Sequence, residues 1–179
     1  MPVIETARLR LRDWTEHDRE PFHRITSDLR VMEFFPDPLS REESDGLIAR
    51  IQAHQAKHGF TFFAAELRAT GELIGFIGMV YTPFEAHFTP CVEIGWRLGA
   101  EFWGQGLATE GAQAVLRLGF DDLKLLEIVA LTVPANRRSR RVMEKLGMTY
   151  DPADDFDHPR LPQGHPLRPH VLYRLRAQH

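Results

Sequence analysis

The apolar and polar residues of this chain follow two different periods. Residues 8–12 (RLRLR) alternate with a period of two, which predicts a strand with one face in solvent. Segments 18–27 and 40–59 instead fit helices, and Ser40 followed by Glu43 predicts a capping box at the start of the second one. The N-terminal part is therefore expected to form one strand and then two helices.

Strand-like and helical segments alternate through the rest of the chain. Residues 61–67 and 72–81 predict a hairpin, because a short turn sequence separates two apolar segments. A strand over 91–98 leads to a helix over 107–120, where apolar and small residues recur at helical spacing. The same patterns predict a strand over 127–133, a helix over 139–146 and a strand over 170–176.

This element order indicates one mixed α/β or α+β domain over residues 1–179. Residues 151–169, rich in Pro, His and Asp, are expected to form a loop before the last strand. With 43% apolar and 26% charged residues the composition is that of a globular protein, which argues against disorder.

Charge and hydropathy exclude several function classes. The net charge of −3 disfavours a nucleic-acid partner, which needs a positive surface. The single cysteine cannot form an intrachain disulfide. The longest apolar run, residues 73–80, is too short to cross a membrane, and no signal-peptide pattern is seen. A cytoplasmic protein without nucleic-acid or membrane partners is expected.

The glycine-containing segment Trp103–Ala108 (WGQGLA) connects a predicted strand to a predicted helix. Glycines allow a ligand close to the backbone, and the first amides of a helix have no partner within it. The segment is therefore suited to an anion such as a diphosphate, although an ordinary tight turn has the same pattern. It matches neither the P-loop nor the dinucleotide-binding fingerprint.

A second polar motif precedes and enters the helix predicted after the strand at 127–133. Asn136, Ser139 and Arg140 share one helical face and offer an amide, a hydroxyl and a cation. Such a face suits a ligand that carries both amide and phosphate groups. Alternatively, Asn136 is a helix N-cap and the arginines are solvated.

Taken together, the motifs VEIGWRL, EFWGQGLATEGA and NRRSRRVMEKLGM resemble the GNAT superfamily of acetyltransferases, and in particular its RimJ/RimL-like branch. The segments TARLRLRDW, VMEFFP and HVLYRL extend the resemblance over nearly the whole chain. It implies a twisted, mostly antiparallel sheet with helices on both faces. It also implies a splay between the strands at 91–98 and 127–133, in which acetyl-CoA binds.

The resemblance also implies which residues contact acetyl-CoA. Backbone groups around Trp96 and Leu98 are expected to pair with the pantetheine arm, and the amides of residues 104–109 with the pyrophosphate. The full implied set is Trp96, Leu98, Trp103, Gly104, Gln105, Gly106, Leu107, Ala108, Thr109, Asn136, Ser139 and Arg140. Trp103 stands where the general family pattern has Gln or Arg, and tryptophan is frequent there in the RimL-like branch.

Glu93 is the leading candidate for a general base, because an alkylammonium acceptor must lose a proton before it attacks a thioester. A carboxylate in an apolar strand must be solvated, paired or in a cleft, and burial would raise its pKa. The alternative is a structural ion pair with Arg97. The resemblance places Ser139 beside the CoA sulfur as a donor to the thiolate, while Tyr150 and Tyr173 are reserve acids.

The C-terminal segment combines histidines and aspartates but does not match a metal site, because its spacings fit no tight ligand pattern. We expect these residues to line the acceptor side, where carboxylates would attract a cationic amine. They are Asp154, Asp155, Asp157, His158, His165 and His170.

The sequence therefore predicts an N-acetyltransferase in which a primary amine attacks acetyl-CoA directly within a ternary complex, without a metal. The acceptor is either a protein N-terminus or a small amine. A CoA-binding module or sensor without catalysis is the alternative. The oligomeric state is open, a homodimer included.

Overall fold

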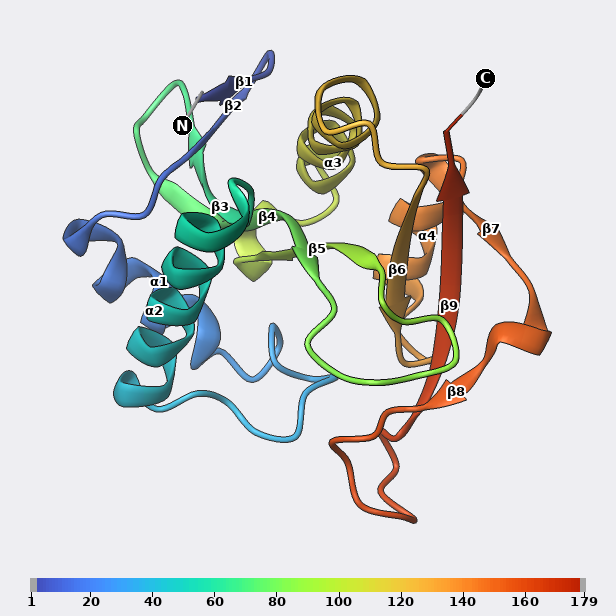
Figure 1. The fold of residues 1–179 in the computed structure, drawn as a ribbon. Coiled ribbons are helices and arrows are strands. Elements are labelled where there is room, and N and C mark those ends of the chain that lie inside the picture. The colour runs from blue at the N-terminus through green and yellow to red at the C-terminus, as the bar shows by residue number, and fades with distance from the viewer. Residues whose placement is uncertain (1–2, 178–179) are drawn as a thin grey trace.

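The structure is a computed structural model that describes residues 3–177, and its strands follow the order β1-β2-β3-β4-β5-β6-β9-β7, with β8 beside β9 (Figure 1). All neighbours are antiparallel except β5 and β6, which are parallel. The strands are β1 (Ile4–Glu5), β2 (Leu9–Arg12), β3 (Phe62–Leu67), β4 (Leu73–Tyr81), β5 (Val92–Leu98), β6 (Glu127–Thr132), β7 (Thr149–Tyr150), β8 (Phe156–Asp157) and β9 (Pro169–Arg176).

Helices cover both faces of the sheet, and the two main apolar clusters lie between the helices and the sheet. The helices are α1 (Arg19–Thr26), α2 (Arg41–His58), α3 (Leu107–Arg117) and α4 (Arg137–Lys145). On one face, α1 and α2 lie side by side and pack on Leu73 and Phe76 of β4 (Figure 1). On the other face, α3 packs on β4, where Gly111 faces Ile77, and α4 packs on β6 and on α3. The mostly antiparallel sheet with helices on both faces confirms the predicted fold class.

The predicted cap of α2 is confirmed, whereas the start of α4 differs from the prediction. Ser40 Oγ accepts from the Glu43 amide and the Glu43 carboxylate accepts from the Ser40 amide, which forms the predicted capping box. Helix α4 begins at Arg137 rather than at Ser139, because the Asn136 side chain caps it. None of the described helices combines the length and the apolar character that a membrane span requires.

Some elements differ from the sequence-based expectation. The strands β1, β7 and β8 were not predicted, because two residues are too few to show a period. The regular part of α3 ends at Arg117, and residues 118–122 continue as a π-helical turn.

The predicted opening of the sheet lies between β5 and β6. Their ladder contains a single pair, Glu93 opposite Val129. On its other side β5 pairs with β4 along its whole length, from Val92 to Leu98. The backbone of residues 95–98 thus has a strand neighbour on one side only, and a cleft opens beside it.

Candidate active site

A cavity of about 810 Å³ lies where β5 and β6 diverge. Its walls come from β5, the start of α3, the start of α4, residues 31–36 and part of segment 158–170. Most of the residues predicted to form the site line this one cavity. They are Glu93, Trp96, Leu98, Trp103, Gly104, Gly106, Leu107, Ala108, Thr109, Asn136 and Ser139.

The glycine loop presents free backbone amides to this cavity. Gly104 (φ 73°) and Gly106 (φ 77°) adopt the left-handed conformation that glycine tolerates, and Gly106 caps α3. Within residues 3–177, no hydrogen-bond acceptor is seen for the amides of residues 104–109, and the first turn closes only with the Glu110 amide on the Gly106 carbonyl. These amides stand at the positive end of the helix dipole, so the loop is suited to an anionic group.

Contacts from the N-terminal strand brace the glycine loop. The Arg8 guanidinium donates to the Gln105 carbonyl at 2.8 Å and pairs with Glu110 at 2.7 Å. The Gln105 side chain donates to the Glu101 carbonyl at 3.0 Å, and Gln105 is not among the described residues that line the cavity. The contact between Arg8 and Glu110 could not be predicted from the sequence, because no local pattern relates two positions that are 102 residues apart.

Trp103 connects the loop to β5. Its indole Nε1 donates to the Leu98 carbonyl at 2.9 Å, so that this carbonyl already has a partner. The Arg138 guanidinium lies 4.2 Å from the centre of the Trp103 ring and pairs with Glu33 at 3.0 Å. The tryptophan therefore links the glycine loop to β5 by a hydrogen bond, and its ring makes a cation–π contact with Arg138 at the cavity.

Asn136 and Ser139 form a small hydrogen-bond network at the N-terminus of α4. Asn136 Oδ1 accepts from the Ser139 amide at 3.2 Å, which is the N-cap alternative considered above. Asn136 Nδ2 donates to Ser139 Oγ at 3.1 Å and to Thr132 Oγ1 at 3.0 Å. Since Ser139 Oγ accepts one hydrogen bond, its own proton is free to be donated elsewhere.

Glu93 stands at the point where the sheet divides, between Val80 of β4 and Val129 of β6. Among the described residues it has no hydrogen-bond or ion-pair partner, and the structural pair with Arg97 is not seen. Burial raises the pKa of Glu93 to about 7. A carboxylate with this pKa is able to accept a proton at neutral pH.

Arg140, Tyr150 and Tyr173 lie together outside the cavity. Arg140 Nε donates to the Tyr173 hydroxyl at 3.2 Å, and its Nη1 donates to the Pro134 carbonyl at 3.2 Å. The Tyr150 hydroxyl donates to Asp155 at 3.0 Å. None of these three residues is among the described residues that line the cavity. Arg140 does not share the cavity-facing side of α4 with Asn136 and Ser139, as the helical spacing predicts, because its side chain reaches Tyr173 of β9.

The acidic residues of the C-terminal segment are engaged elsewhere. Asp154 forms a two-pronged ion pair with Arg174 at 2.7 and 3.0 Å, and Asp157 pairs with Arg168 at 3.1 Å. The expectation that these carboxylates line the acceptor side is thus wrong, because Asp154 and Asp157 pair with arginines, Asp155 accepts from Tyr150, and none of the three lines the cavity.

Two histidines of the same segment do line the cavity. The rings of His158 and His170 lie 5.0 Å apart, and His158 lies 4.6 Å from Phe84. Burial lowers the pKa of His158 to about 4 and also lowers that of His170, so both are neutral at pH 7. Within residues 3–177, no group of three or more His, Cys, Asp or Glu side chains could hold a metal ion.

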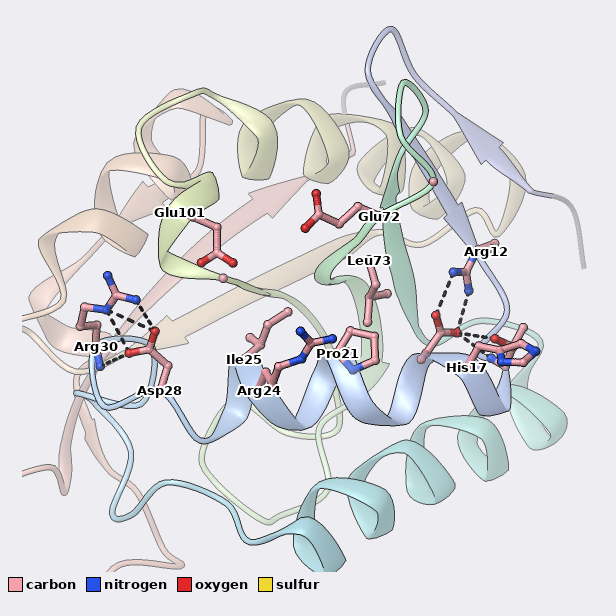
Figure 2. Close-up of a pocket in the computed structure, with 14 residues that line it drawn as sticks. Arg12, His17, Pro21, Arg24, Ile25, Asp28, Arg30, Glu72, Leu73 and Glu101 are labelled. Atoms are coloured by element: carbon pink, nitrogen blue, oxygen red, sulfur yellow. Dashed lines mark hydrogen bonds and ion pairs between the residues drawn. The ribbon is translucent and has the colours of Figure 1, made fainter.

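A second depression, of about 700 Å³, lies beside α1 (Figure 2). Its charged groups mostly neutralise one another: Arg12 pairs with Asp18 at 2.7 Å and Arg30 with Asp28 at 2.6 Å. None of the residues predicted to contact acetyl-CoA lines it. The cavity beside β5 is therefore the better candidate for chemistry.

Comparisons with known proteins agree with this geometry. The family model "Acetyltransferase (GNAT) domain" matches residues 8–149. The chain is 34% identical over 146 residues to the uncharacterized N-acetyltransferase YnaD of Bacillus subtilis, covering 81% of each protein.

Two solved structures share the fold over almost the whole chain. An acetyltransferase from Agrobacterium tumefaciens str. C58 is 28% identical and superposes with a TM-score of 0.79, over 98% of this chain and 94% of that one. RimL, a ribosomal L7/L12 α-N-protein acetyltransferase solved in complex with coenzyme A, superposes with a TM-score of 0.78 over 98% of each chain, at 16% identity. The protein therefore belongs to the GNAT family and is an acetyltransferase.

Proposed function

We propose that residues 1–179 form one GNAT domain that transfers the acetyl group of acetyl-CoA to a primary amine by direct attack in a ternary complex. The observation that carries this proposal is the convergence of three features in a single cavity. These are the free amides of residues 104–109, the unpartnered carboxylate of Glu93 and the hydroxyl of Ser139. Each answers a separate requirement of acyl transfer.

The residues of the cavity fit the chemical groups of acetyl-CoA. The amides of residues 104–109 would hold the pyrophosphate, with Arg138 and Arg141 of α4 available for further phosphate charge. The unpaired edge of β5 at Trp96 would pair with the amide groups of the pantetheine arm. Since the Leu98 carbonyl accepts from Trp103, the backbone contact is assigned to Trp96 rather than to that carbonyl.

Glu93 is proposed as the general base. The carboxylate first takes one proton from the acceptor ammonium. The neutral amine nitrogen then forms its bond to the acetyl carbon, the carbon–sulfur bond breaks, and the second proton of the nitrogen passes to the departing CoA thiolate. Its pKa of about 7 leaves a large fraction of the group ionised at neutral pH. Val80 and Val129 are its neighbours on the two adjacent strands.

Ser139 is proposed as the donor to the departing thiolate. Its hydroxyl accepts from Asn136, which leaves the proton pointing away from that amide and available to the sulfur. Asn136 is in this view a positioning residue, because it acts through Ser139 and through the helix cap.

The experiment that tests the proposal measures thiol release from acetyl-CoA in the presence of a panel of small amines and N-terminal peptides. Calorimetric titration with acetyl-CoA is run in parallel. The proposal expects binding and amine-dependent thiol release, and it expects Glu93→Gln to slow release while the Kd for acetyl-CoA stays unchanged. Binding without release for any amine would instead support a CoA-binding module, and absence of binding would refute the cofactor assignment.

A further inference from the structure

Arg97 is a cation of the cavity that the mechanism above does not use. It lies on the same face of β5 as Glu93 and Gly95, since side chains two residues apart in a strand point the same way. Its neighbour across the ladder is Phe76 of β4. This is the face covered by α1 and α2, whereas the glycine loop leads into α3 on the other face.

The guanidinium of Arg97 lies against two aromatic rings. Its Cζ lies 4.1 Å from the centre of the Phe35 ring and 5.4 Å from that of Phe76. A cation–π contact of this kind provides no hydrogen-bond acceptor of the usual type, so the five N–H donors of the guanidinium still need partners. The rings fix the orientation of the group without neutralising it.

No acceptor within residues 3–177 satisfies those donors. Arg97 Nε is buried and has no hydrogen-bond partner, and no ion pair joins Arg97 to Glu93. Glu93 is the one acidic side chain among the described residues that line the cavity. Burial lowers the pKa of Arg97 to about 10, so the group stays charged at neutral pH. The Arg97 side chain is half-buried, and a charge in such a position is costly unless a partner reaches it.

An apolar surface separates Arg97 from Glu93. The Cα atoms of Glu93 and Arg97 lie roughly 13 Å apart, because the two residues are four positions apart in a strand. The Phe62 ring lies between them, against the backbone of Gly95, and it stacks on Phe76 with ring centres 4.7 Å apart. This face of the cavity thus presents a carboxylate at one end, aromatic rings in the middle and an unpaired guanidinium at the other end.

We infer that Arg97 is a specificity-determining residue that binds a carboxylate carried by the acceptor, at a distance from the amine that Glu93 deprotonates. The inference rests on the proposed function, because it places the amine of the acceptor at Glu93 and the carboxylate of the same acceptor at Arg97, at the two ends of one cavity. The acceptor class is an amine that also carries a carboxylate, either a small amino acid-like molecule or a peptide whose acidic side chain follows its N-terminus. The phosphates of CoA are assigned to the opposite face, where Arg138 and Arg141 stand.

The test compares acceptors that differ only in charge. One arm uses ω-amino carboxylates of several chain lengths and their primary amides, and the other uses tetrapeptides with Glu or Gln at the second position. The wild type is expected to prefer the carboxylate member of at least one pair by roughly 10- to 100-fold in kcat/KM, as for hydrogen bonds to a charged group. The arm in which the preference appears identifies the source of the carboxylate.

The variants then assign that preference to one residue. Arg97→Met keeps the packing between the rings but removes the charge, and it is expected to bring the ratio within each pair to about one. The Kd for acetyl-CoA and the rate with the amide members are expected to stay unchanged. Arg97→Lys keeps the positive charge but lacks the planar guanidinium, so it should retain part of the preference for the carboxylate acceptor. If Arg97→Met does not fold, the comparison of Arg97→Lys with the wild type tests the inference instead. Arg50→Met, an exposed site on α2, is the matched control and should behave like wild type.

Two results would overturn the inference while leaving the proposed function intact. The first is thiol release without a preference for carboxylates in any pair. The second is an Arg97→Met variant that loses affinity for acetyl-CoA or loses activity equally with both members, which would make the arginine a cofactor contact or a packing residue. Absence of acetyl-CoA binding and of thiol release with every amine would refute the proposed function, and this inference with it.

Discussion

Replacing Glu93 by Gln is expected to make the folded protein more stable at alkaline pH while it impairs catalysis. The pKa of Glu93 is raised from an ordinary 4.5 to about 7 by burial. The folded state therefore holds the proton more tightly than the unfolded state does. Ionisation of Glu93 thus costs stability as the pH rises from about 4.5 to about 7, whereas at lower pH the group is neutral and the cost disappears.

The size of this effect follows from the same shift. At about 1.4 kcal/mol per pH unit, the full cost in the wild type is about 3 kcal/mol above pH ~7 and below about 1 kcal/mol near pH ~5. Glutamine carries no charge, so the variant does not lose this stability. The free energy of unfolding of Glu93→Gln minus that of the wild type should therefore grow by about 2–3 kcal/mol between pH ~5 and pH ~8.

Urea denaturation followed by circular dichroism at both pH values measures this difference. Taking the difference between variant and wild type removes the contributions of all other titrating groups that the two proteins share. Glu85→Gln, at an exposed position in the loop after β4, is the control. A difference that does not change with pH would refute the reasoning, because it would mean that Glu93 has no buried, unpartnered carboxylate to ionise.

Three further predictions concern turnover and binding. First, kcat/KM should rise with pH through an apparent pKa of about 7, since the base must be ionised, and Glu93→Gln should abolish that acidic limb in a pH–rate profile. Second, Gly106→Ala should weaken acetyl-CoA binding in calorimetry and lower stability by about 1 kcal/mol, because it places a side chain at φ 77°; unchanged affinity would argue against the loop as the anion site. Third, Ser139→Ala should lower kcat with little change in KM, whereas Asn136→Ala should in addition cost about 1 kcal/mol of unfolding free energy through loss of the helix cap; equal stability of the two variants would contradict the capping role.

Local sequence signals, namely periodicity, turns and helix caps, predict much of the fold. The hairpin at 62–81, the capping box of α2 and the strand–glycine loop–helix unit depend on residues that are near one another in the chain. Periodicity and caps act over one or two turns, so a single sequence reveals them. The resemblance to GNAT enzymes added the splay of the sheet, which no local period encodes.

Tertiary structure alone decided the chemistry of the cavity walls. The alternation of β5 put Glu93 and Arg97 on one face, but only the packing of Phe35, Phe62 and Phe76 shows that they do not pair. The sequence predicts an acidic C-terminal segment that attracts a cation, yet Arg174 pairs with Asp154 and Arg168 with Asp157. Charges interact through space over a few ångströms, and residues far apart in the chain supply the partners. Composition and order thus determine which elements form, whereas the folded arrangement determines which charges remain without a partner and are available for a ligand.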